Sequence, residues 1–158
     1  MIGQALAESL GRPFIDADDL HPATNKAKMA AGIPLQDEDR WPWLDDVALA
    51  SNAAGDAVVA CSALQLNYRD RLRDQLPGAA FIQLDVAREE LEYRLNARSH
   101  EFMPASLLET QLSTLEDLTS TEHGIRVPAN LQPQQLVHHI AEALAQDGCV
   151  PGKGTPGL

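Results

Sequence analysis

The sequence is poor in basic residues and in aromatic residues. Lys and Arg number 12 against 23 Asp and Glu, which gives a formal net charge of -11 and an isoelectric point near 4.7. A nucleic-acid-binding or membrane-surface protein needs a positive field, so this balance argues against both roles. It still allows an anionic small substrate that is held by a few local arginines.

Cysteines and long apolar runs are also scarce. Cys61 and Cys149 form no disulfide framework, and Cys61 lies inside an apolar run, which predicts a reducing, cytoplasmic setting. No apolar stretch approaches the roughly 20 residues of a membrane-spanning helix, and the N-terminus lacks the layout of a signal peptide. We therefore expect one ordinary domain without a membrane partner.

What is present is an alternation of strand and helix patterns. Helices are expected at residues 2–10, 22–31, 41–54, 66–76, 88–98, 105–115 and 133–145, and strands at "PFIDA", "AVVACSA", "AAFIQLDV" and "GIRVPA". This order predicts an α/β fold, a three-layer parallel sheet with helices on both faces. A single domain is expected over residues 1–145, with a disordered Gly/Pro-rich tail at 146–158. Trp41 and Trp43 are interpreted as packing residues.

Acidic residues follow the first predicted strand, which ends near Ile15. Ligands bind at the carboxyl ends of strands in such sheets, where Asp16, Asp18 and His21 stand. Alternation along an extended segment would turn Asp16 and Asp18 to the same side. Two carboxylates there suit a magnesium shell and a hydroxyl that must lose its proton. Alternatively, both are turn and helix-cap residues, and His21 simply opens a helix.

Several arginines are candidate anion contacts. Arg69 lies in the first two turns of a predicted helix, where its planar fork suits a carboxylate. Arg94 and Arg98 share a helix face just before the polar segment "SHEFMPAS", and such a pair can neutralise a transferring phosphate. Salt bridges on a solvated face are the alternative, and they are preferred for Arg71 and Arg73.

Taken together, these segments resemble the gluconokinase family of small P-loop kinases, which is related in fold to shikimate and adenylate kinases. The resemblance lies in "DADDLHP" from Asp16, "PLQDEDR" from Pro34, "PWL" from Pro42, "CSAL" from Cys61, "YRD" from Tyr68 and "FMPASLLETQLSTLE" from Phe102. These segments follow the family's order and cover nearly all of residues 1–145. The resemblance implies phosphorylation of the 6-hydroxyl of D-gluconate, with ATP and Mg²⁺, by a homodimer.

The resemblance also implies roles for individual residues. Asp18 would orient the substrate hydroxyl and accept its proton, and Asp16 would help to hold Mg²⁺ through water. The contacts with gluconate would come from four residues: His21, Arg40, Arg69 and Gln111. Arg94 and Arg98 would serve a lid at about residues 99–105. With the resemblance, the functional interpretation of Arg69, Arg94 and Arg98 is favoured.

The sequence departs from the family pattern at three places. The G-x-x-x-x-G-K-[ST] phosphate loop and the strand before it do not occur ahead of "DADDLHP". That strand is central in the family's sheet, so "AVVAC" and "AFIQL" are expected to expose apolar faces. A start codon placed too far downstream, or a truncated chain, is our hypothesis for the missing loop and strand. Gln65 replaces a usual Lys, and Glu101 stands where the family often has His.

Two other functions stay open. One is a catalytically silent relative without the phosphate loop, which binds gluconate or a partner protein. The other is a sister kinase acting on another small acid or alcohol, which the block from His21 to Arg40 disfavours.

Overall fold

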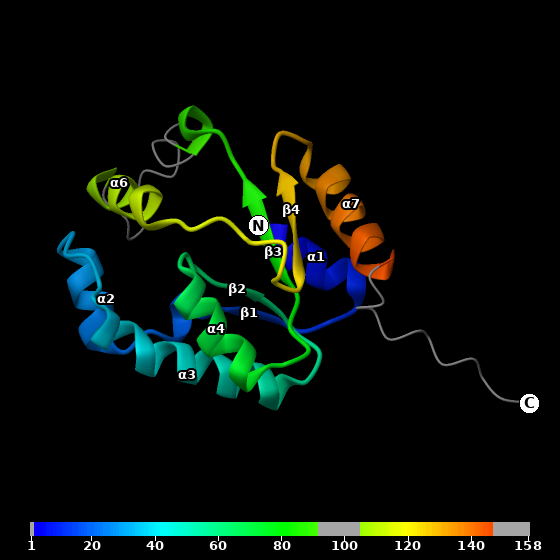
Figure 1. Cartoon of the computed structure of the whole chain (residues 1–158). Coiled ribbons are helices and arrows are strands. Elements are labelled where there is room, and N and C mark those ends of the chain that lie inside the picture. The colour runs from blue at the N-terminus through cyan, green and yellow to red at the C-terminus, as the bar shows by residue number, and fades with distance from the viewer. Residues whose placement is uncertain (1, 92–104, 147–158) are drawn as a thin grey trace, which may run out of the picture.

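The computed structural model describes residues 2–91 and 105–146. Its helices are α1 (Ile2–Leu10), the short 3-10 helix η1 (Ala17–Leu20), α2 (Ala23–Ala30), α3 (Asp37–Ala54), α4 (Leu66–Gln75), α6 (Ala105–Thr114) and α7 (Pro133–Gln146). Its strands are β1 (Phe14–Asp16), β2 (Val58–Ala60), β3 (Phe81–Asp85) and β4 (Gly124–Pro128), as Figure 1 shows. The predicted alternation is confirmed for the described residues, whereas most of the helix predicted at 88–98 lies outside them. Apart from Ala105 and Gln146, the predicted lid and tail lie outside the described residues.

Helix α3 begins earlier than the apolar pattern predicted, at Asp37 instead of Trp41. The Asp39 carboxylate accepts a hydrogen bond from the backbone N–H of Gln36 at 3.0 Å, and Lys28 of α2 donates to the same carboxylate at 2.6 Å. Three acidic residues in the first turn also suit the positive end of the helix dipole. Capping and charge therefore decide where this helix begins, and the spacing of apolar residues reports neither of them.

The strands form two separate parallel pairs. β1 pairs with β2, with Phe14 opposite Val58, and β3 pairs with β4, with Phe81 opposite Gly124. Within residues 2–91 and 105–146 no ladder joins the two pairs. The gap lies between β2 and β3, the two strands that were expected to flank the family's central strand and to lack a neighbour there. Every residue of β1, β2 and β3 is only half-buried. Such partial burial is expected for a strand that has an edge without a paired neighbour.

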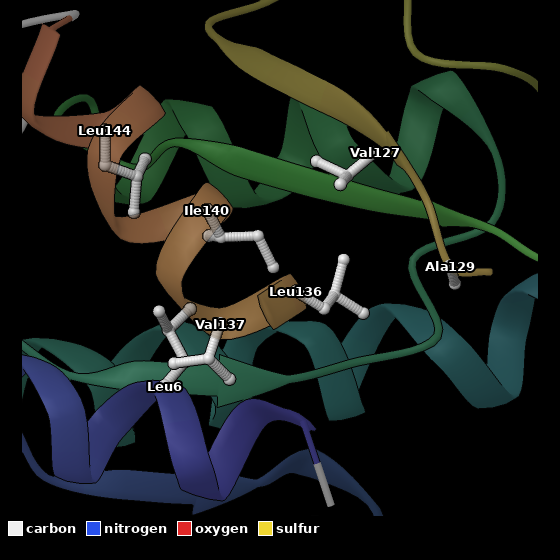
Figure 2. Packing of buried hydrophobic residues seen from close by; sticks show 7 residues of the cluster. All are labelled: Leu6, Val127, Ala129, Leu136, Val137, Ile140 and Leu144. Carbon is white, nitrogen blue, oxygen red and sulfur yellow. The ribbon is translucent and has the colours of Figure 1, made fainter. Parts of the chain in front are cut away.

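Side chains of β2 and β3 alternate between two hydrophobic clusters. Val59 and Phe81 pack against the first cluster, and Val58 and Ile82 pack against the second. The first, here the α3/α4 core, consists of Ala17, Trp43, Leu44, Val47, Ala48, Tyr68 and Leu72. The second, here the α1/α7 core, consists of Leu6, Val127, Ala129, Leu136, Val137, Ile140 and Leu144 (Figure 2). Helices therefore cover both faces, as predicted and as Figure 1 shows.

The α1/α7 core follows directly from the sequence of α7. Pro133 begins the helix, a position where its missing N–H costs nothing. Leu136, Ile140 and Leu144 then recur every four residues and point inward together (Figure 2). Burying a side chain such as the fully buried Ile140 stabilises a fold by about 1.5–3 kcal/mol. In the described part of the chain, no helix has both the length and the apolar character to cross a bilayer.

Candidate active site

The chain turns sharply at the carboxyl end of β1. β1 ends at Asp16, whose side chain accepts a hydrogen bond from the Asp18 N–H at 3.1 Å and so caps η1. The expectation that Asp16 and Asp18 lie on the same side of an extended segment is wrong, because Asp18 belongs to the 3-10 helix. The helix-cap alternative holds for Asp16. Capping one N–H leaves a carboxylate further lone pairs, so the cap does not exclude a second role.

Asp18 is exposed, but its carboxyl is not an ordinary one. Its pKa is raised, first because surrounding protein atoms remove part of its hydration, and then because the Asp16 and Asp19 carboxylates lie near it; Lys26 opposes the shift. A carboxylate with a raised pKa is a better proton acceptor near neutral pH. Asp18 therefore has the electrostatic surroundings of a general base.

His21 lies beside Asp18 and is 5% exposed. Its ring stacks on Trp43, with centroids 4.1 Å apart and planes 13° apart. Burial lowers the pKa of His21 to about 4, and the charges of Arg40 and Lys26 act in the same direction. The ring is therefore neutral at pH 7, and its approach to Asp18, 3.8 Å from Nε2 to Oδ1, is not an ion pair at that pH.

Asn25 determines which nitrogen of His21 carries the proton. The Asn25 side-chain nitrogen lies 3.4 Å from His21 Nδ1 and donates to the Asp39 carbonyl at 2.8 Å. An amide nitrogen only donates, so Nδ1 accepts and the proton of the neutral ring lies on Nε2, which faces Asp18. The sequence pattern assigned Asn25 no role, although its position one helical turn after His21 was a usable signal.

Trp43 is the packing partner of the His21 ring. It is fully buried, and its indole N–H donates to the Ala17 carbonyl at 2.7 Å, which ties α3 to η1. Trp41 packs edge-on against Tyr68 at 5.4 Å between ring centroids. The predicted packing role of both tryptophans is confirmed.

Arg40 places a positive charge near the cluster at the end of β1, which consists of Asp16, Asp18 and His21. Its guanidinium lies over the Tyr68 ring, 5.4 Å from the centroid. Its charge lowers the pKa of His21, after the larger effect of burial, and also acts on the thiol of Cys61, which follows β2. Among the residues that the structure describes, no carboxylate forms a salt bridge with Arg40. The positive charge is therefore available to an anion.

Arg69 is placed differently, because it is 4% exposed and its donors are occupied. Nε and one terminal nitrogen donate to the Glu122 carboxylate at 2.7 and 3.0 Å. The other terminal nitrogen donates to the carbonyls of Leu64 and Glu116 at 3.2 and 2.9 Å. Arg69 thus ties α4 to the segment after α6. Its contact with gluconate stays a prediction, which this arrangement does not favour.

The remaining predicted residues are not brought into the cluster by any described contact. Gln111 lies half-buried on α6, and within the described part of the chain no hydrogen bond or ion pair joins its side chain to Asp18 or His21. Arg94 and Arg98 lie outside the described residues. Their predicted roles stay predictions.

Arg71 and Arg73 make the surface ion pairs that the sequence favoured. Arg71 binds Asp45 of α3 with two bonds of 2.8 Å, and Arg73 pairs with Asp70 and with Glu122. The predicted exposed ion pair is confirmed for Arg71, although its partner comes from the neighbouring helix, and for Arg73 with Asp70; the second partner of Arg73, Glu122, is buried.

The described residues contain no group of three or more His, Cys, Asp or Glu side chains that would hold a metal by themselves. Mg²⁺ rarely uses such a cage and is usually bound by one or two carboxylates, waters and substrate phosphates. Asp16, a carboxylate at the end of β1 with lone pairs left beyond the cap of η1, is a donor of that kind. The residues present fit the metal.

Comparisons with known proteins place the chain first in a class. The Shikimate kinase family model matches residues 1–145. The APS kinase of Mycobacterium tuberculosis has the same fold, with a TM-score of 0.61 at 14% identity. The fold is therefore the α/β fold of the P-loop kinases that resemble shikimate kinase.

More similar relatives narrow this class. A gluconokinase of Gluconobacter oxydans is 42% identical over 148 residues, which cover 88% of this chain and 83% of the relative. A thermosensitive gluconokinase of Escherichia coli is 43% identical over 153 residues, 92% of this chain and 77% of the relative. The crystal structure of a gluconokinase from Sinorhizobium meliloti superposes with a TM-score of 0.83 at 42% identity, over 92% and 83% of the two chains. The chain belongs to the gluconokinase family of shikimate-kinase-like P-loop kinases.

Proposed function

We propose that this protein acts as a gluconokinase, transferring the terminal phosphoryl group of ATP to the 6-hydroxyl of D-gluconate. Family membership supports the activity. The observation that carries the acceptor side is the cluster at the end of β1, where a carboxylate of raised pKa, a neutral donor and an available cation lie together. The first two suit the 6-hydroxyl of gluconate, and the cation suits its carboxylate.

The chemistry assigned to these residues is simple. The bond between the 6-hydroxyl oxygen and phosphorus forms as the bond from phosphorus to the ADP oxygen breaks, and Asp18 takes the hydroxyl proton. His21 Nε2–H donates a hydrogen bond to that hydroxyl, and the Arg40 guanidinium binds the carboxylate. Phosphoryl transfer has a loose transition state, so positioning and charge account for most of the rate enhancement.

The proposal also covers the phosphoryl donor, ATP, and its bound Mg²⁺. Bound Mg²⁺ would neutralise phosphate charge, and Asp16 is the residue that would help to hold it through water, with phosphates completing the shell. We also propose a phosphate loop and its strand ahead of this sequence, supported by the missing ladder between β2 and β3 in the described ranges. A native mass about 2 kDa above 17.1 kDa is expected. A homodimer is proposed too, and light scattering tests it.

Gluconate-dependent ADP formation tests the function. The native protein is assayed with ATP, Mg²⁺ and a panel of sugar acids and neutral sugar alcohols, and the product is identified by phosphorus NMR. We expect gluconate to give the highest kcat/KM and a phosphate ester at carbon 6. Faster turnover of another acid would indicate the sister kinase. Gluconate binding without ADP formation would indicate the silent relative.

A further inference from the structure

Tyr68 is held rigidly on three sides. It is 5% exposed in the α3/α4 core, and the edge contact with Trp41 fixes one side of its ring. Its hydroxyl donates to Asp37 Oδ1 at 2.5 Å. Burial and this hydrogen bond raise the pKa of Tyr68 to about 12, so the hydroxyl stays protonated as a donor. A ring fixed in this way is a stable platform for whatever lies on its face.

The Arg40 guanidinium lies on that face. An aromatic face attracts a cation through its quadrupole, yet it carries no negative charge and takes none of the in-plane N–H donors. Arg69 and Arg71 show the alternative, because both are paired with carboxylates at 2.7–2.8 Å. Arg40 is thus oriented without a carboxylate on its N–H donors; the nearby Asp39 carboxylate feels its charge but is bonded to Lys28.

The hydroxyl of Tyr68 has a second effect. Asp37 and Arg40 are three residues apart at the start of α3, a spacing at which side chains on a helix meet and opposite charges pair. The Asp37 carboxylate instead accepts the Tyr68 hydroxyl, which ties it to α4. Tyr68 therefore both supports the cation and occupies the carboxylate that would otherwise compete for it.

We propose that Tyr68 is a positioning residue for carboxylate recognition: its ring carries Arg40, its hydroxyl holds Asp37 away, and the two together set a preference for a carboxylate-bearing acceptor. This inference rests on the proposed function, since it assigns the carboxylate of gluconate to Arg40.

The test compares gluconate with glucitol, in which a neutral CH₂OH replaces the carboxylate. The ratio of kcat/KM for the two acceptors is measured in the native protein, in Tyr68→Phe, and in Tyr68→Phe combined with Asp37→Asn. Tyr68→Phe keeps the ring but releases Asp37, so we expect the ratio to fall about two- to fivefold through the KM for gluconate, with the KM for ATP unchanged. The added Asp37→Asn removes the competing charge and is expected to restore the ratio.

A purely structural role gives a different pattern. If Tyr68 only ties α3 to α4, the double variant has lost the same tie and does not recover, and that result overturns the proposal. A native ratio in Tyr68→Phe overturns it as well. Tyr68→Leu combined with Asp37→Asn removes the ring, and we expect the ratio to stay low; recovery there would show that the ring is not needed. Asp37→Asn alone is the matched control and is expected to keep the native ratio.

These outcomes are separable from failure of the proposed function. Absence of gluconate turnover in the native protein would refute that function, and with it the carboxylate assigned to Arg40. Normal turnover with an unchanged ratio in Tyr68→Phe refutes the inference alone.

Discussion

The two cores of the molecule are filled from the same strands but are chemically different. All seven residues of the α1/α7 core are apolar. The buried polar side chains of the described residues all belong to the α3/α4 side: His21, Asn25, Ser51, Arg69 and Glu122. Each has a partner, since no buried side-chain polar atom in the described ranges lacks a hydrogen bond. Burying a polar group costs free energy unless it is paired, so this side of the fold depends on specific partners. Two of the five, His21 and Asn25, lie at the proposed site, whereas Ser51, Arg69 and Glu122 have structural partners.

The largest expected effect separates catalysis from stability. Asp18→Asn removes the proton acceptor without emptying a core, so we expect kcat to fall roughly 10³-fold. The free energy of unfolding should change by less than about 0.5 kcal/mol, because the side chain is exposed. Initial-rate assays of ADP formation measure kcat, and urea unfolding measures the free energy of unfolding.

Ile140→Ala is the contrasting variant in the α1/α7 core. It leaves a cavity beside a fully buried helix face, so the free energy of unfolding should fall by about 2–5 kcal/mol. The KM for gluconate should not change while the protein stays folded. A large KM change in Ile140→Ala, or a large stability loss in Asp18→Asn, would break the division between the two cores.

The second prediction concerns Arg69, for which the sequence and the structure point in different directions. Arg69→Met leaves Glu122, whose side chain is 2% exposed, without its main partner. Removing one member of a buried pair costs about 3–5 kcal/mol, and the remaining bond from Arg73 keeps the loss towards the lower end. Thermal and urea unfolding measure it. A raised KM for gluconate with nearly native stability would instead support the contact with gluconate.

The third prediction is a pH dependence from His21. The unfolded ring gains a proton below its ordinary pKa of 6.5, whereas the folded ring stays neutral down to about 4. This contribution to stability is therefore fully present above pH 6.5 and is lost as the pH falls through this window. At 1.36 kcal/mol per pH unit, the loss approaches about 3 kcal/mol at pH 4.

Urea unfolding between pH 7 and 4.5 measures this slope, and His21→Asn is the control that should lack it. Arg69 chiefly holds the pKa of Glu122 far below its ordinary value of 4.5. The stability that Glu122 contributes is therefore lost at a lower pH than the range of this experiment. An equal slope in His21→Asn would contradict the assignment.

The fold was largely predictable because the helices and strands alternate with clear apolar periods. The start of α3 was not, since Asp37 and Asp39 act through charge and capping. Pairing between strands was also beyond the pattern: a run such as "AVVAC" shows that a strand is buried but not which neighbour it bonds. The gap between β2 and β3 was expected from the resemblance, but the pairing of β1 with β2 and of β3 with β4 came only from the structure.

The site was predictable where its residues are close in sequence. Asp16, Asp18 and His21 lie within six positions, and the structure brings them together. The surroundings of Arg69 were not predictable, because its partner Glu122 lies 53 residues further on and helical spacing finds only partners on the same helix. Long-range pairs of this kind are the main gap in the sequence-based view.

The smallest expected effect tests whether the outer face of α3 and α4 takes part at all. Arg71 and Asp45 form a two-bond ion pair, but their side chains are 47% and 42% exposed. Solvent screens such a pair, so Arg71→Ala should lower the free energy of unfolding far less than Arg69→Met does, and it should leave the KM for gluconate and for ATP unchanged. Urea unfolding at low and high salt measures the loss, which should shrink as salt rises. A loss as large as that of Arg69→Met would show that helix pairing depends on this face, and the contrast between a paired interior and a tolerant surface would then fail.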